Sequence, residues 1–201
     1  MPKLDLKRQL RTLYDAPREP VLVEVPAMNF LMVDGTGDPN GPEYQAAVEA
    51  LYGLSYALKF MIKKAGGPDY GVLPLEGLWW ADDLSDFVKG ERSAWKWTAM
   101  IMQPEPVTDE LVARAREDLG RKKDLPALPA TRFERFEEGL SVQVMHVGPY
   151  ADEGPVIERL HRFAQDRGYR LRGRHHEIYL GDPRKAAPDK LRTILRQPVG
   201  Q

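Results

Sequence analysis

The sequence predicts an α+β fold in which a strand-helix-strand-strand module occurs twice and forms a curved antiparallel sheet. Two observations support this fold class. The order of extended and helical segments in the first half of the chain returns in the second half. Each half reads as a strand-helix-strand-strand unit, which makes a small antiparallel sheet with its helix on one face. We expect helices on one face of the sheet and a ligand cleft on the other.

The bulk composition limits the possible partners. The chain has 201 residues, a formal net charge of -1 and no cysteine. The longest basic run is only Arg121–Lys123, so nucleic acid and anionic membranes are not expected as partners. Without cysteine, thiol nucleophiles and disulfides are excluded. No apolar run approaches the ~18 residues of a membrane span, and the charged N-terminus does not resemble a signal peptide, so we expect a cytoplasmic protein.

The first half-repeat is expected to span about residues 20–105 of a single domain, 1–201. The segment "VLVEVPAMNFLMVDG" reads as extended chain interrupted by Pro26. From Glu43 to Lys64, apolar residues recur every three or four positions, which predicts a helix that ends before Gly66. Two strands follow, "YGVLPLEGLWW" and "SAWKWTAMIMQP".

A connecting helix is expected at about 108–123, with Thr108 as its N-cap. The second half-repeat, about 130–201, opens with "RFERFEEG" and "LSVQVMHVGPY", which read as a hairpin joined around Glu138 and Gly139. A helix from about Glu153 to Arg167 comes next, with Gly168 as its C-terminal stop. The strands "YRLRGRHHEIYL" and "LRTILRQPV" complete the half.

The strand "HHEIYL" carries the most chemistry. Period-two alternation places His175, Glu177 and Tyr179 on one face, which suits an open cleft, and His176, Ile178 and Leu180 on the other, which suits the core beneath a helix. Because the adjacent histidines point to opposite sides, they are poorly placed to share a metal ion. No metal site is expected.

Aromatic residues gather around a second glutamate in the first half. Glu76 precedes Trp79 and Trp80, and the next strand carries Trp95 and Trp97. Tryptophans are often core residues, but some of these should reach the cleft, where aromatic walls around a carboxylate suit a flat apolar or cationic ligand. Tyr44 and Tyr150 occupy similar places in the two halves and either line the cleft rim or hold loops. A partly desolvated Glu177 would serve as a proton acceptor, and the Tyr179 hydroxyl would donate to an oxyanion on the ligand.

Several segments resemble the GyrI-like small-molecule-binding domain. They are "HVGPY", "LHRFAQDRGYRLRGRHHEIYLGDP", "LRTILRQPV", "PLEGLWW" and "WKWTAMIMQP", and the resemblance extends from about residue 20 to 199. It implies a duplicated strand-helix-strand-strand fold. It also implies a functional glutamate at Glu177 with Tyr179 beside it, while Glu76 matches the glutamate of "PLEGLW" in the stand-alone members.

The resemblance leaves two main functions open. Stand-alone members hydrolyse cyclopropanoid cyclohexadienones, which would make Glu177 and Tyr179 catalytic, without a cofactor. The pocket would be lined by Glu76, the four tryptophans, Tyr44, Tyr150 and His175. Regulator members bind lipophilic cations through a buried glutamate, which implies binding without turnover. Residues before Val21 are too few for a DNA-binding region, and a ligand-sequestering adaptor is a third alternative. We expect the hydrolase.

Overall fold

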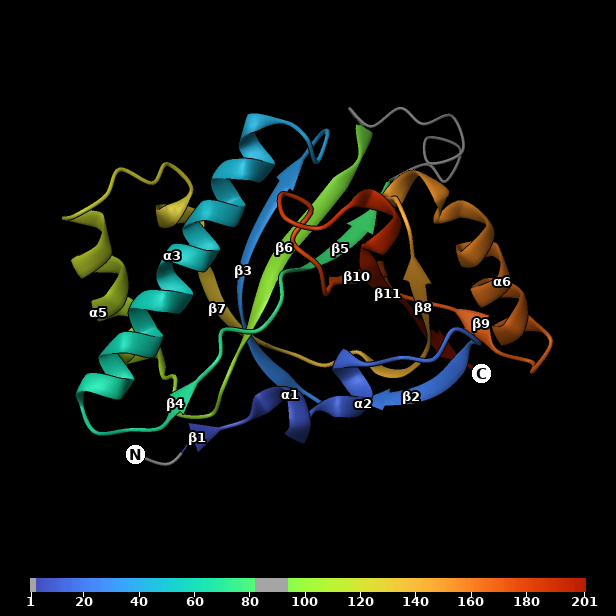
Figure 1. Cartoon of the computed structure of the whole chain (residues 1–201), viewed down its shortest axis with the longest axis horizontal. Coiled ribbons are helices and arrows are strands. Elements are labelled where there is room, and N and C mark those ends of the chain that lie inside the picture. Colours follow the sequence, from blue (N-terminus) through green and yellow to red (C-terminus); the bar gives the residue numbers. More distant parts are fainter. Residues whose placement is uncertain (1–2, 82–93) are drawn as a thin grey trace. The chain divides into compact units, whose positions relative to one another are not determined.

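The computed structural model of the chain describes residues 3–81 and 94–201 (Figure 1). The chain divides into two compact units. Unit 1 contains Met1–Gln9, Met28–Leu75 and Trp80–Phe136, and unit 2 contains Leu10–Ala27, Glu76–Trp79 and Glu137–Gln201. Each unit combines antiparallel strand pairs with helices, which confirms the predicted α+β class.

Within the described residues, unit 1 has three antiparallel strands in the order β7–β3–β6. They are β3 (Met28–Thr36), β6 (Lys96–Gln103) and β7 (Arg132–Phe136). Helix α3 (Pro42–Lys64) packs on β3 and β6 through the apolar stripe that predicted it, and α5 (Asp109–Gly120) lies beside α3 (Figure 1). Thr108 caps α5 as expected, because its hydroxyl accepts a hydrogen bond of 3.3 Å from the Leu111 backbone N–H.

The N-terminal part of unit 1 holds short elements. They are β1 (Lys3–Leu4), α1 (Leu6–Gln9) and β4 (Asp69–Tyr70). Strand β1 pairs with β4 in parallel. The sequence predicted a strand beginning at Ser93, and this residue lies outside the described residues. The described strand in this segment is β6.

Unit 2 contributes five antiparallel strands in the order β2–β8–β11–β10–β5, with the short β9 also paired to β11. Their bounds are Val21–Val25 for β2, Glu76–Trp80 for β5, Gly139–Val147 for β8, Arg170–Leu171 for β9, His175–Tyr179 for β10 and Arg192–Gly200 for β11. Helix α6 (Gly154–Gln165; Figure 1) follows the 3-10 turn Tyr150–Asp152. Leu160 and Ala164 of α6 belong to one buried core cluster with Val144 and Leu195. The short helix α2 (Arg11–Tyr14) precedes β2.

The strand-helix-strand-strand order occurs twice, as β3-α3-β5-β6 and as β8-α6-β10-β11, so the duplicated module is confirmed. The predicted hairpin between "RFERFEEG" and "LSVQVMHVGPY" is wrong. Strand β7 pairs with β3 in unit 1, whereas β8 pairs with β2 and β11 in unit 2. The Phe136 ring packs edge-on against Phe30 at 6.2 Å, so apolar packing on β3 prevails over the short connection to β8.

Candidate functional site

Unit 2 brings together the residues of strand β10 and their neighbours on β5. Opposed residues of an antiparallel pair lie on the same face of a sheet. His175 opposes Trp79, Glu177 opposes Gly77 and Leu195, and Tyr179 opposes Thr193. These residues therefore share one face, as the alternation within the strand predicted for His175, Glu177 and Tyr179.

This face is the one that α6 covers. Leu195, the partner of Glu177, belongs to the core cluster formed with Leu160 and Ala164 of α6. The expectation that Glu177 lies on the face away from the helix, with His176 beneath it, is therefore wrong. Alternation assigns residues to two faces but cannot tell which face a helix covers. We call this side of the unit 2 sheet the helix face and the opposite side the network face.

A chain of hydrogen bonds holds Glu177 on the helix face. The Trp79 indole N–H donates to the Tyr179 hydroxyl oxygen at 3.0 Å, and the Tyr179 hydroxyl donates to Glu177 Oε2 at 2.7 Å. The hydroxyl proton of Tyr179 is thus directed at the Glu177 carboxylate. From the sequence, this proton was expected to point at an oxyanion on the ligand. The Glu177 side chain keeps 16% of its surface exposed, so solvent and small ligands reach it.

Gly77 makes room for this chain. A Cβ atom built on Gly77 would lie 2.7 Å from Trp79 Nε1 and 3.1 Å from the Tyr179 hydroxyl. Because Gly77 opposes Glu177 in the register, the Trp79 indole and the Tyr179 hydroxyl occupy the place of the missing side chain beside the carboxylate. The Gly in "LEGLWW" therefore has a packing reason that periodicity does not reveal.

Glu153 is a further carboxylate of this site, and the sequence analysis did not select it. It stands at the N-cap of α6 and is 5% exposed. Burial raises the pKa of Glu153 to about 9, and the charge of Glu177 adds to this effect, whereas the Thr193 hydroxyl works in the opposite direction. The one sequence signal that would have selected it is a glutamate at a helix start where Ser, Thr, Asp or Asn is usual.

Two histidines also lie between α6 and the sheet. His175 Nε2 is 3.5 Å from Glu177 Oε1. Burial lowers the pKa of His161 on α6, and the neighbouring His175 lowers it further. Among the described residues, no group of three or more His, Asp or Glu side chains is arranged to hold a metal ion.

The network face carries the second predicted glutamate. Glu76 is 1% exposed and opposes Ile178, so it points away from Glu177. It accepts a hydrogen bond of 2.5 Å from the Tyr14 hydroxyl and one of 2.9 Å from His176 Nε2. The structure thus does not bring Glu76 and Glu177 together on one face.

His176 joins Glu76 to a second buried carboxylate. Its Nδ1 lies 3.0 Å from both oxygens of Glu138, and Arg196 Nη1 donates to Glu138 Oε2 at 3.3 Å. Burial lowers the pKa of His176, but the charge of Glu138 and the hydrogen bonds to Glu138 and Glu76 outweigh burial and raise it to about 9. The network therefore balances two cations against two carboxylates.

The segment that contains α2 covers this network. Arg196 Nη2 donates to the Leu13 carbonyl oxygen at 2.7 Å and to Gln143 Oε1 at 3.0 Å. The Gln143 amide in turn donates to the Thr12 carbonyl oxygen at 2.8 Å. Each of these polar side chains has its hydrogen bonds, which is what a buried structural network requires.

The other predicted aromatic residues divide between the units. Tyr150 lies in unit 2, and its ring packs edge-on against Tyr179 at 5.7 Å. Of the four tryptophans, only Trp79 lies in unit 2 with Glu177. In unit 1, Tyr44 lies in the first turn of α3 rather than in a loop and packs edge-on against the buried Trp97 at 4.9 Å. Trp80 and Trp95 are half-buried in unit 1.

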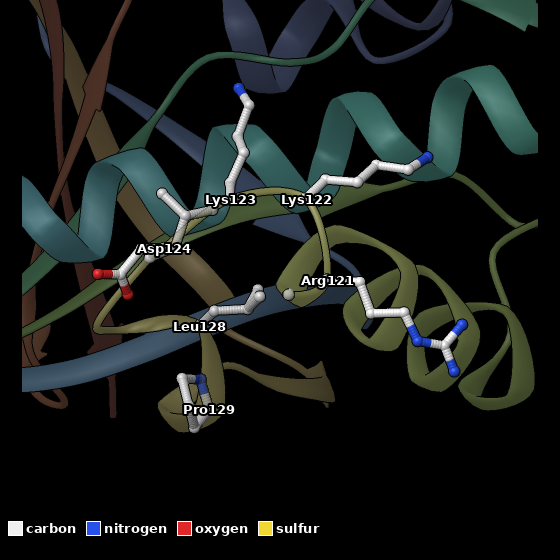
Figure 2. Close-up of a pocket in the computed structure, with 8 residues that line it drawn as sticks. Arg121, Lys122, Lys123, Asp124, Leu128 and Pro129 are labelled. Carbon is white, nitrogen blue, oxygen red and sulfur yellow. The ribbon is translucent and has the colours of Figure 1, made fainter.

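A surface hollow of unit 1 offers no comparable site. It lies at the end of α5, and its lining includes Arg121, Lys122 and Lys123 (Figure 2). The charged ends of these side chains point in different directions in Figure 2, and Arg121 is paired with Glu117 and Asp118. Among the described residues, no helix has the length and apolar character to cross a membrane.

Comparisons with known proteins place these features in a family. The family model of the GyrI-like small molecule binding domain matches residues 18–199. The crystal structure of an uncharacterized conserved protein from Listeria innocua is 43% identical, with a TM-score of 0.93, and the match covers 98% of this chain and 100% of that chain. A hydrolase from Listeria innocua is also 43% identical, with the same coverage and a TM-score of 0.88.

A more distant structure agrees in fold alone. The EcmrR C-terminal domain is 14% identical, with a TM-score of 0.60, and the match covers 91% of this chain and 98% of that chain. No curated protein matches the chain.

Proposed function

Because this chain belongs to the GyrI-like small-molecule-binding family, we propose that it is a hydrolase acting on cyclohexadienones that carry a strained cyclopropane ring. The observation that best supports this proposal is the position of the Glu177 carboxylate. It accepts a hydrogen bond from the Tyr179 hydroxyl on the helix face and is partly exposed to solvent. Identity of 43% over almost the whole chain to a protein described as a hydrolase favours an enzyme over a pure binding module.

In the proposed reaction, Glu177 accepts a proton from a water molecule. The water oxygen forms a bond to a cyclopropane carbon, and the strained carbon–carbon bond breaks. Its electron pair enters the dienone, which becomes an aromatic phenolate. Ring strain and aromatisation drive this reaction, so it needs no metal or organic cofactor.

The neighbouring residues take supporting roles in this proposal. Trp79 and Tyr179 fix the orientation of the carboxylate through the bonds of 3.0 and 2.7 Å, which is the usual function of groups that hold a general base. The Tyr150 ring, with 39% of its surface exposed, offers a wall for a flat ligand, and His175 borders Glu177. Trp80, Trp95, Trp97, Tyr44 and Glu76 stay predictions as ligand-lining residues.

A second function is binding of lipophilic cations without turnover. It is favoured by one observation, the partly exposed carboxylate of Glu177 beside the aromatic Tyr150 and Tyr179 rings, since such a combination attracts organic cations. A small aromatic or cationic lipophilic molecule is the partner in both functions.

Turnover of a cyclopropanoid cyclohexadienone, followed by its absorbance, separates the two. We expect hydrolysis by the wild type and a loss of about 100-fold or more in Glu177→Gln, the range for removal of a general base. The exposed Glu158→Gln on α6 serves as the control and should hydrolyse like the wild type. Quenching of tryptophan fluorescence without turnover would instead identify a binding protein.

A further inference from the structure

Several buried polar atoms of the helix face have no hydrogen-bond partner among the described residues. They are Glu153 Oε1, His161 Nε2, both ring nitrogens of His175, and Thr193 Oγ1. All four side chains belong to unit 2, to α6 or its N-cap and to β10 and β11 on the face below it. Buried polar groups without partners are rare in proteins, and a role in ligand chemistry is a reason to keep several of them in one place.

Glu153 is a buried carboxyl of this group that no cation offsets within the described residues, and the Thr193 hydroxyl is the group that favours its charged form. Its side chain makes no capping hydrogen bond to α6, and it has no ion pair within the described parts of the chain. The groups that act on it are Glu177 from β10 and Thr193 from β11, and on its own segment the nearby titratable group is Tyr150. A buried carboxyl that neither caps its helix nor meets a cation gives no stability, so a role in ligand chemistry explains it better.

We infer that Glu153 is the proton donor of the site and delivers its proton to the carbonyl oxygen of a bound dienone. The inference rests on the proposed function for its substrate. Two neighbouring carboxyl groups that cannot both ionise divide the roles of acid and base between them. Burial and the charge of Glu177 hold the proton on Glu153 at neutral pH, with a pKa of about 9. Glu177 is the partly exposed member, bonded to Tyr179, and it acts as the base.

The protons and electrons of the step balance. Water loses one proton to Glu177 while its oxygen bonds to the cyclopropane carbon. The electron pair of the broken carbon–carbon bond ends on the dienone oxygen, which takes the proton of Glu153. The product is a phenol that carries a hydroxyalkyl group. Transfer of the proton from Glu177 back to Glu153 restores the site, so no oxidant, reductant or further reactant is needed.

The first test uses a dimethyl-substituted cyclohexadienone that lacks the cyclopropane ring and therefore binds without reacting. Infrared spectroscopy of the bound compound reports the hydrogen bond to its carbonyl oxygen. We expect a carbonyl stretch shifted to lower frequency in the wild type and in the Glu158→Gln control, and a clearly smaller shift in Glu153→Leu, whose side chain has no hydrogen-bond donor. An unshifted carbonyl in the wild type, an equal shift in Glu153→Leu, or no binding of the compound would each contradict the inference.

The second test measures turnover of the cyclopropanoid substrate against pH. Glu153→Gln should lower kcat/KM by about 100-fold and should lose the decline of the wild-type rate above about pH 9. A purely structural Glu153 would leave both unchanged, because glutamine imitates the protonated carboxyl. If the wild type shows the infrared shift but no turnover, the proposed hydrolase function fails while the donor role of Glu153 stands.

Discussion

The two faces of the unit 2 sheet bury polar groups in opposite ways. On the network face, Glu76, Glu138, His176 and Arg196 are each hydrogen-bonded, and their charges balance. On the helix face, polar atoms of Glu153 and His175 lie buried without hydrogen-bond partners among the described residues. A satisfied network stabilises and specifies a fold, whereas unsatisfied groups reduce stability. We therefore expect the network face to stabilise the fold and the helix face to carry the proposed ligand chemistry.

The largest expected difference in stability between the two faces comes from the adjacent histidines His175 and His176. His176→Leu removes a buried cation and leaves Glu76 and Glu138 facing an apolar side chain. We expect the free energy of unfolding to fall by about 3–5 kcal/mol. His175→Leu is the matched control, and we expect a change within about 1 kcal/mol, because neither of its ring nitrogens has a hydrogen-bond partner within 3–81 and 94–201. Urea denaturation measures both, and equal losses would contradict the assignment.

One residue on each face, His176 and Glu153, should make the free energy of unfolding depend on pH. His176 has a folded-state pKa of about 9 and an ordinary value of 6.5, so its contribution is complete below pH 6.5 and disappears as the pH rises through 9. Glu153 also keeps its proton to about pH 9 in the folded state, whereas its ordinary value is 4.5. The folded state therefore binds more protons than the unfolded state between these limits, and stability falls as the pH rises.

Each group contributes a slope of up to about 1.4 kcal/mol per pH unit between pH 7 and 9. We expect Glu153→Gln to remove one of the two contributions and to raise stability by about 1 kcal/mol at neutral pH. Urea denaturation at several pH values measures the slope. A slope unchanged in Glu153→Gln would show that Glu153 does not hold a proton there.

Gly77→Ala tests whether the Trp79–Tyr179 hydrogen bond positions Glu177. The new Cβ would lie 2.7 Å from Trp79 Nε1, so the indole has to shift and its bond to Tyr179 lengthens. We expect stability to fall by about 1–3 kcal/mol and kcat/KM to fall about 10-fold. Gly71→Ala is the control, because a Cβ atom there meets no heavy atom within 4 Å. Unchanged turnover in Gly77→Ala would mean that the Trp79–Tyr179 bond does not position Glu177.

Much of the fold was predictable because its signals are local. The apolar spacing of α3, the Thr108 cap and the alternation within β10 all depend on residues a few positions apart. Strand pairing was not predictable in the same way, and β7 pairs with β3 rather than with its neighbour β8. Such pairings depend on packing between residues far apart in sequence, which periodicity does not encode.

The sequence predicted part of the candidate site and missed one of its carboxyl groups. Glu177, Tyr179 and Trp79 were expected near one another, and they share a hydrogen-bonded chain. Glu76 was expected beside them, but it joins Tyr14 and His176 on the opposite face. Glu153 was missed because its importance comes from burial and from the charge of Glu177, and neither is visible in a helix-start segment such as "YADEGPV".

The two glutamates that the sequence paired test the central claim most directly. The measurement is the free energy of unfolding of Glu76→Gln and Glu177→Gln by urea denaturation at pH 7. The account predicts a loss of about 2–3 kcal/mol for Glu76→Gln, since charge-assisted bonds to Tyr14 and His176 weaken. It predicts no loss, or a small gain, for Glu177→Gln, since the charge of Glu177 helps to raise the pKa of Glu153, and its removal reduces the cost of keeping Glu153 protonated in the folded state. Equal destabilisation by both variants would contradict the division of the sheet into a structural face and a functional face.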